Sequence, residues 1–186
     1  MKDVEIVDIK KVKYPKNIKI YEIRYIEDNQ TKVKEVTKNL DVVKILIYHK
    51  EKNAFVLVKQ FRPLVYINHP ELAYRYELCG GREDKGGLSS KEIAIEEVLE
   101  ETGYKVKDLT KITTFVANSK MTLYYTEVDE SLKVSHGGGV DYENIELFFL
   151  PLNDAKNFIY DESKPKRAGL SFSIMWFFDN KNGTYS

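Results

Sequence analysis

Four glutamates crowd one short stretch of the chain, namely Glu96, Glu97, Glu100 and Glu101. On a helix, like charges three or four residues apart lie side by side and destabilise it by a few tenths of a kcal/mol per pair. No lysine in the last turn before Gly103 offsets these charges. Clustered carboxylate oxygens suit Mg²⁺ or Mn²⁺, whereas zinc draws on His or Cys. The pattern therefore favours a divalent cation site, and a solvated acidic face is the alternative.

The same stretch carries helix signals at both ends. Ser89 followed by Glu92 predicts a capping box, and Gly103 stands where a left-handed residue would end the helix. At about 100° per residue, we expect the apolar residues on one face and the four glutamates on the other. The predicted apolar face consists of Ala94, Ile95, Val98 and Leu99.

The elements that must position this helix are mostly strands. Alternating β-branched and aromatic residues predict an N-terminal three-stranded meander at 4–12, 18–26 and 31–37. Further strands are predicted at 41–49, 53–61, 74–79, 111–117, 121–128 and 145–152, and helices at 153–160 and 169–180. Strands and helices mixed in this order predict an α+β fold with helices packed on a mixed sheet.

Composition excludes several classes of partner. The 29 Lys and Arg residues equal the 29 Asp and Glu residues, so no global field recruits nucleic acid or an anionic membrane. The only cysteine, Cys79, cannot form an intramolecular disulfide. No run of 18 apolar residues occurs, and no secretory leader is recognisable. We expect a soluble protein of the cytoplasm.

The order of these glycines and glutamates resembles a known sequence motif. The ordered string Gly81, Glu97, Glu100-Glu101, Gly103-Tyr104 resembles the Nudix box, a glycine loop followed by a metal-binding helix. Two positions depart from it: Glu96 replaces the usual Arg, which helps to orient the helix Glu, and Leu88 falls near the usual acidic residue. The stretches "VLVKQFRPLVY", "YELCGG", "LYYTEV", "GGGVDYENIELFFLPL" and "SFSIMWF" are similar to the UDP-sugar pyrophosphatase group of Nudix hydrolases, relatives of ADP-ribose pyrophosphatases.

This resemblance covers roughly residues 40 to 178. It implies a Nudix fold, in which a mixed β-sheet is packed between helices, with a small N-terminal antiparallel β-sheet in addition. Residues 1–40 would form an N-terminal β-strand region that helps to build a homodimer, and residues 41–186 would form the Nudix hydrolase domain. No nucleic acid or membrane partner is expected.

The implied activity is Mg²⁺-dependent hydrolysis, with Mn²⁺ as a possible substitute. A nucleoside diphosphate sugar of the UDP-glucose type would be cleaved to a nucleoside monophosphate and a sugar 1-phosphate. ADP-ribose pyrophosphatase is the alternative within this chemistry. A non-catalytic module that binds a nucleotide sugar or ADP-ribose is the alternative outside it, favoured by the two departures from the box.

Carried over position by position, the resemblance implies a metal site made by the Gly80 carbonyl with Glu97, Glu100 and Glu101. The general base of the ADP-ribose branch comes from a loop ahead of a late strand. The candidate catalytic residues are Glu143, then Asp141, together with Glu100 of the box helix.

Other candidates lie around this site. Arg62 could bind the substrate pyrophosphate through its guanidinium, or could serve a structural ion pair. Gly137, Gly138 and Gly139 would give the late loop freedom to close, or would form a plain turn. His136 is the one histidine expected near the site, and Cys79 is expected to be a buried apolar residue rather than a nucleophile.

Overall fold

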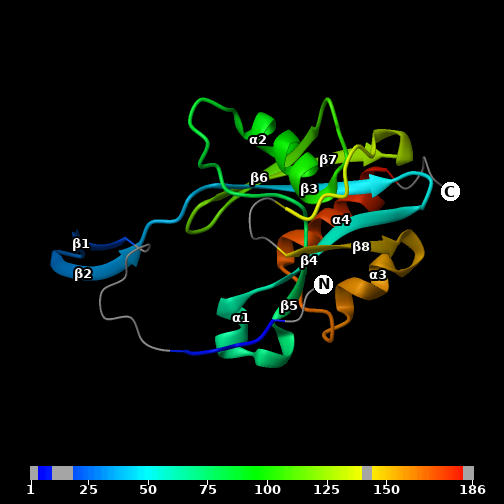
Figure 1. Ribbon diagram of the computed structural model, residues 1–186. Coiled ribbons are helices and arrows are strands. Elements are labelled where there is room, and N and C mark those ends of the chain that lie inside the picture. Colours follow the sequence, from blue (N-terminus) through cyan, green and yellow to red (C-terminus); the bar gives the residue numbers. More distant parts are fainter. Residues whose placement is uncertain (1–3, 10–18, 140–143, 182–186) are drawn as a thin grey trace.

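The chain is built around a mixed, six-stranded β-sheet (Figure 1). The computed structural model describes residues 4–9, 19–139 and 144–181. Strand order is β5-β4-β3-β7-β6, with β8 also paired to β4; β3 and β7 run parallel, and the other neighbours are antiparallel. The strands are β3 (Val42–His49), β4 (Ala54–Phe61), β5 (Tyr74–Glu77), β6 (Thr110–Val116), β7 (Lys120–Val128) and β8 (Ile145–Pro151). Each confirms a strand expected from the sequence, and the predicted α+β class is confirmed.

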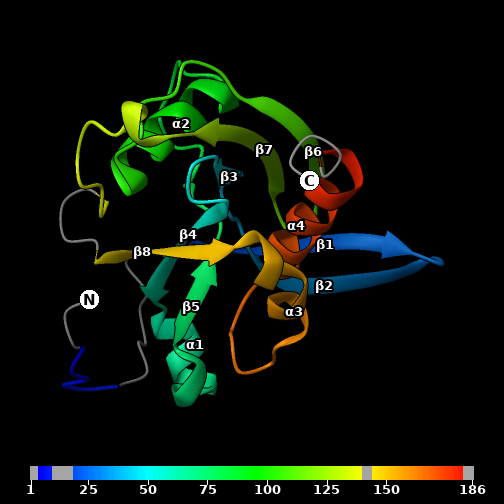
Figure 2. The same cartoon turned by 90° about the vertical axis from the view of Figure 1, so that its right-hand side faces the viewer.

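Helices cover both faces of this sheet. Helix α2 (Ser90–Glu97) packs on one face, and α3 (Leu152–Tyr160) and α4 (Ala168–Asn180) pack on the other (Figures 1 and 2). Successive residues of a strand point to opposite faces. Val43, Ile45 and Ile47 of β3 accordingly join the core under α2, whereas Leu46 and Tyr48 join the core under α3 and α4. The central strand is buried on both sides, which fixes its register.

The N-terminal strands form a separate two-stranded hairpin. Strand β1 (Ile20–Glu27) pairs with β2 (Gln30–Thr37) through a tight turn in which Asp28 and Asn29 both have positive φ, 52° and 60°. Two such residues are what a hairpin turn of the I′ type requires. The strand predicted at 4–12 is wrong in its described part, because residues 4–9 form no strand; residues 10–12 lie outside the described residues. The hairpin projects away from the central sheet (Figure 1).

Three short elements in the described part of the chain were not expected from the sequence. Helix α1 (Pro63–Asn68) begins with a proline, whose fixed φ suits the first turn of a helix, and a 3₁₀ turn (Pro70–Leu72) follows it. Another 3₁₀ turn spans Glu130–Leu132. Among the helices of the described residues, none combines the length and the apolarity needed to cross a bilayer.

Candidate active site

The acidic helix begins and ends as the sequence predicts. Ser89 Oγ accepts a hydrogen bond from the Glu92 N–H at 3.3 Å, and the Glu92 carboxylate accepts one from the Ser89 N–H at 2.8 Å, so the capping box is complete. After Glu97 the helix widens into a π-turn (Val98–Thr102), and Gly103 ends it in the left-handed conformation with φ 73°. Single π-turns within helices occur often at functional sites.

The predicted division of this helix into an apolar and an acidic face is wrong at two positions. Leu99 is 36% exposed, whereas Glu101 is only 7% exposed. Glu101 follows Ala94 by seven residues and Val98 by three, which is the spacing that returns to the same side of a helix. A carboxylate therefore reaches the buried face, where it needs a hydrogen-bond partner.

The Gly80-Gly81 turn supplies that partner. The Gly80 N–H donates to Glu101 Oε2 at 2.8 Å, and the turn is held against β3 by bonds from Ile45 N to the Cys79 carbonyl and from Val43 N to the Gly81 carbonyl. A Cβ on Gly81 would lie 2.1 Å from Glu97 Oε1. A Cβ on Gly80, whose φ is 133°, would lie 2.2 Å from the Val43 carbonyl oxygen. Gly81 is thus required for the close approach of the turn to the helix, and Gly80 for its close approach to β3.

The glutamates interact strongly because they share one small volume. Burial, and then the charges of Glu101 and Glu100, raise the pKa of Glu97 to about 7. The Lys85 ammonium lies on the solvent side and contacts Glu96 at 2.7 Å and Glu100 at 3.2 Å. Its hydrogen bond to Glu96 is the first cause of a raised pKa for Lys85. Where the box usually has an Arg, this chain thus has an acid at 96 paired with a lysine from the preceding loop.

The donor set of this turn and helix fits a divalent cation that keeps several waters. In the described part of the chain, no three His, Cys, Asp or Glu side chains converge into a ready-made cage. Mg²⁺ does not need one, since it commonly takes one or two carboxylates plus waters and substrate phosphates. Glu97 and Glu101 meet the glycine turn, and Glu100 lies toward solvent with Lys85. The available donors are oxygens throughout.

A second charged cluster, which the sequence only partly predicted, lies beside the turn. Arg62 holds Glu77 with two hydrogen bonds, both at 2.7 Å, and Arg75 Nε donates to the same carboxylate at 2.6 Å. Arg62 is therefore in the ion pair that was its alternative role, with 32% of its side chain exposed. Glu77 and Arg75 were not singled out from sequence. Their signal was the charged pair that "YRYELC" carries within an otherwise apolar strand.

The late glycine loop is tied to the end of the acidic helix. Gly138 N donates to the Glu101 carbonyl at 2.8 Å, and Gly139 N donates to the Glu100 carbonyl at 3.1 Å. A Cβ on Gly137 would lie 2.5 Å from the Glu101 carbonyl oxygen. Gly137 therefore permits close packing, while Gly138 and Gly139 anchor the loop through their N–H groups; the freedom of the loop to close stays a prediction. Asp141 and Glu143 lie outside the described residues.

The remaining cysteine and histidine candidates are either buried in the core or exposed at the edge of the site. Cys79 is fully buried, donates to the Glu97 carbonyl at 3.4 Å, and has its pKa raised by burial, as expected of a buried apolar residue. His49 is also fully buried, and burial lowers its pKa. His136 is exposed in the loop before the glycines.

Comparison with known proteins identifies relatives of this chain. The chain is 33% identical over 190 residues to the uridine diphosphate glucose pyrophosphatase of Bos taurus, a match that covers 84% of this chain and 86% of that protein. It is 34% identical over 128 residues to the GDP-mannose pyrophosphatase of Pectobacterium atrosepticum, covering 66% and 65%. A solved structure described as an ADP compounds hydrolase superposes with a TM-score of 0.70 over 97% of this chain and 95% of that one, at 17% identity. No protein-family model matches the chain.

A mixed sheet that holds a glycine turn against a glutamate helix is the arrangement of a Nudix hydrolase. The chain belongs to the Nudix hydrolases, in the branch that contains the UDP-sugar and ADP-ribose pyrophosphatases.

The close approach at Gly81 can be tested directly. We expect Gly81→Ala to push the Glu97 carboxylate aside and to weaken Mn²⁺ binding at least tenfold, as measured by calorimetry. The thermal midpoint should change little, because the colliding atoms belong to a flexible side chain. Gly86→Ala is the matched control, since nothing lies within 4 Å of its Cβ position. Equal Mn²⁺ affinity in the two variants would contradict this role of Gly81.

Glu77 should make stability depend on pH in the acid range. Burial alone would raise its pKa, but the Arg62 hydrogen bonds and the charges of Lys44, Arg62 and Arg75 lower it from 4.5 to about 2. A lowered folded-state pKa stabilises the fold above pH 4.5, and this contribution is lost as the pH falls from 4.5 toward 2. We expect Glu77→Gln to reduce the free energy of unfolding at pH 7 by about 3 kcal/mol and to flatten its decline in that window.

The measurement is urea unfolding of the wild type and the variant at a series of pH values. Glu22→Gln, on an exposed strand, is the control and should follow the wild-type curve. A Glu77→Gln curve parallel to that of the wild type across this window would refute the assignment.

Proposed function

We propose that the chain hydrolyses nucleoside diphosphate sugars of the UDP-glucose type to a nucleoside monophosphate and a sugar 1-phosphate. The observation that carries the proposal is the seating of Glu97 and Glu101 against Gly80-Gly81. Support comes also from the relatives named UDP-glucose pyrophosphatase, one of which matches 84% of the chain. Hydrolysis forms one P–O bond to water and breaks the bridging P–O bond, so no covalent enzyme intermediate is needed.

The proposed cation is Mg²⁺, with Mn²⁺ as a substitute, held by Glu97, Glu100, Glu101 and the Gly80 carbonyl. When bound, a divalent cation neutralises pyrophosphate oxygens and lowers the pKa of a bound water. The protein must then provide a separate base for the attacking water, because a carboxylate that binds a cation has a suppressed proton affinity. Glu143 is our first candidate and Asp141 the second, each on the loop that follows the anchored glycines.

The anchoring of Gly138 and Gly139, which precede the two candidate bases in the chain, supports the choice of base. Both glycines are hydrogen-bonded to the carbonyls of Glu100 and Glu101, two of the proposed metal-binding residues. Gly139 therefore lies beside the end of the acidic helix, and β8 begins at Ile145. Arg62 is kept as a proposed substrate contact, with its guanidinium oriented by Glu77.

The activity and the base are tested together. With Mg²⁺, we expect UDP-glucose to yield UMP and glucose 1-phosphate, and ADP-ribose to be cleaved more slowly. Glu143→Gln should lower kcat by about two to four orders of magnitude with little change in KM, which is the usual contribution of a general base. Asp141→Asn should reduce kcat less. Products are measured by chromatography of the released phosphomonoesters.

Each other outcome selects a different assignment. A greater loss in Asp141→Asn than in Glu143→Gln would move the base to Asp141. Nearly wild-type kcat in both variants would return the base to the acidic helix, with Glu100 the candidate there. Faster cleavage of ADP-ribose than of UDP-glucose would favour the ADP-ribose pyrophosphatase assignment. Binding of either compound without cleavage, with Mg²⁺ or Mn²⁺, would make the protein a binding module.

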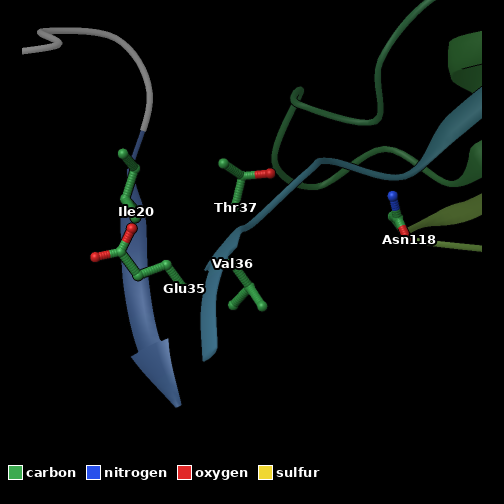
Figure 3. Close-up of a pocket in the computed structure, with 5 residues that line it drawn as sticks. All are labelled: Ile20, Glu35, Val36, Thr37 and Asn118. Atoms are coloured by element: carbon green, nitrogen blue, oxygen red, sulfur yellow. The ribbon is translucent and has the colours of Figure 1, made fainter. Parts of the chain in front are cut away.

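We further propose that the β1–β2 hairpin packs against a second copy of the chain. Among the described strands, β1 and β2 pair only with each other, and an isolated two-stranded hairpin is marginally stable in water. Between the hairpin and the body lies a hollow of about 600 Å³, lined from one side by the strands and from the other by Asn118 (Figure 3). The hairpin and the segment after it expose Ile20, Tyr21, Ile23, Ile26, Val33, Val36 and Leu40.

Disruption of this surface should change the oligomeric state. Tyr21, Ile23 and Val36 lie on one face of the hairpin, because directly paired residues share a face. We expect light scattering after size exclusion to give a dimer for the wild type and a monomer for Ile23→Asp. Ile67→Asp on α1, a residue that is 60% exposed against 48% for Ile23, should remain dimeric because α1 is remote from the hairpin (Figure 1). A wild-type monomer would reject the proposal.

A further inference from the structure

One lysine reaches into the glycine turn from the central strand. Lys44 lies on β3, and its side chain is only 15% exposed. Its ammonium donates to the Gly80 carbonyl at 2.6 Å and to the Leu78 carbonyl at 3.3 Å. It also lies 4.0 Å from Glu77 Oε2. A largely buried ammonium needs such oxygens, since its desolvation is costly without them.

The strongest of these contacts uses an oxygen that the proposed cation also needs. The Gly80 carbonyl is a proposed metal ligand, and in this structure it accepts a short hydrogen bond from Lys44. An ammonium and a divalent cation at the same oxygen repel each other strongly in a partly buried site. Binding of the cation at Gly80 is therefore opposed by the Lys44 ammonium, and it becomes more favourable when that ammonium moves away from the carbonyl.

We propose that Lys44 is a displaceable internal cation that competes with the divalent ion for the Gly80 carbonyl. This inference rests on the metal site of the proposed function. In the free protein the ammonium weakens metal binding. A substrate brings the negative charge of its pyrophosphate, which offsets the added positive charge and favours displacement. Metal and pyrophosphate thus promote each other's binding, and such coupling is reciprocal.

Removal of the Lys44 ammonium should raise the affinity of the site for a divalent cation. We expect Lys44→Met to bind Mn²⁺ at least tenfold more tightly than the wild type in calorimetry without nucleotide. UDP should increase Mn²⁺ affinity strongly in the wild type and less in Lys44→Met. Lys44→Arg keeps the charge and should retain the weak binding of the wild type. Lys166→Met is the matched control, because that ammonium also donates to a backbone carbonyl, of Asp161 at 2.7 Å, but in another part of the molecule.

The outcomes separate this inference from the proposed function. If the wild type and a folded Lys44→Met bind Mn²⁺ with equal affinity, the proposed role of Lys44 is wrong. The metal site itself still stands in that case if Glu101→Gln abolishes Mn²⁺ binding. Absence of Mn²⁺ binding in every variant and in the wild type would reject the site and this inference together. If Lys44→Met does not fold, Lys44→Gln replaces it, since an amide can still donate to the Gly80 carbonyl without a charge.

Discussion

The candidate site depends on one close approach, that of the Gly80-Gly81 backbone to the acidic helix. The Gly80 N–H donates to the Glu101 carboxylate. Gly81 has no Cβ and so leaves room for the Glu97 carboxylate. On its other side the turn is hydrogen-bonded to β3, the strand that is buried on both faces. Because protein interiors are close-packed, a side chain at either glycine would have to displace backbone or a carboxylate. The position of the carboxylates is thereby set by the strand that is buried on both faces.

So much negative charge in one place is tolerated because cations approach it from several directions. Lys85 contacts Glu96 and Glu100 from the solvent side, where screening by water makes such pairs weak. Lys44 approaches from β3 and Arg62 from the end of β4, and both converge on Glu77. Burial together with the charges of Glu101 and Glu100 raises the pKa of Glu97, and the charges of Lys44 and Lys85 oppose this only in part. The charge distribution is therefore uneven, and burial and neighbouring charges disfavour ionisation of Glu97.

Local signals explain which parts of the fold could be predicted from sequence. The Ser89 capping box, the Gly103 terminus and the β3–β4 hairpin each depend on residues close together in the chain. The inward orientation of Glu101 was missed because a carboxylate was assumed to face solvent, whereas its partner is a backbone N–H twenty-one residues earlier. The contact between Lys44 and Gly80 joins residues thirty-six apart and has no local signal at all. Such long-range polar contacts follow from tertiary packing and are visible only once the strands are placed.

The anchoring of the late loop links the two halves of the proposed site. A helix leaves its last carbonyls without partners inside the helix, and here the Glu100 and Glu101 carbonyls accept bonds from Gly139 and Gly138. The side chains of those two glutamates belong to the acidic cluster, while their backbone carbonyls hold the segment that leads to the candidate bases. A shift of this helix end would therefore move both groups together. Gly137 is needed because only a backbone without Cβ can lie against the helix end at this distance: its Cβ would lie 2.5 Å from the Glu101 carbonyl oxygen.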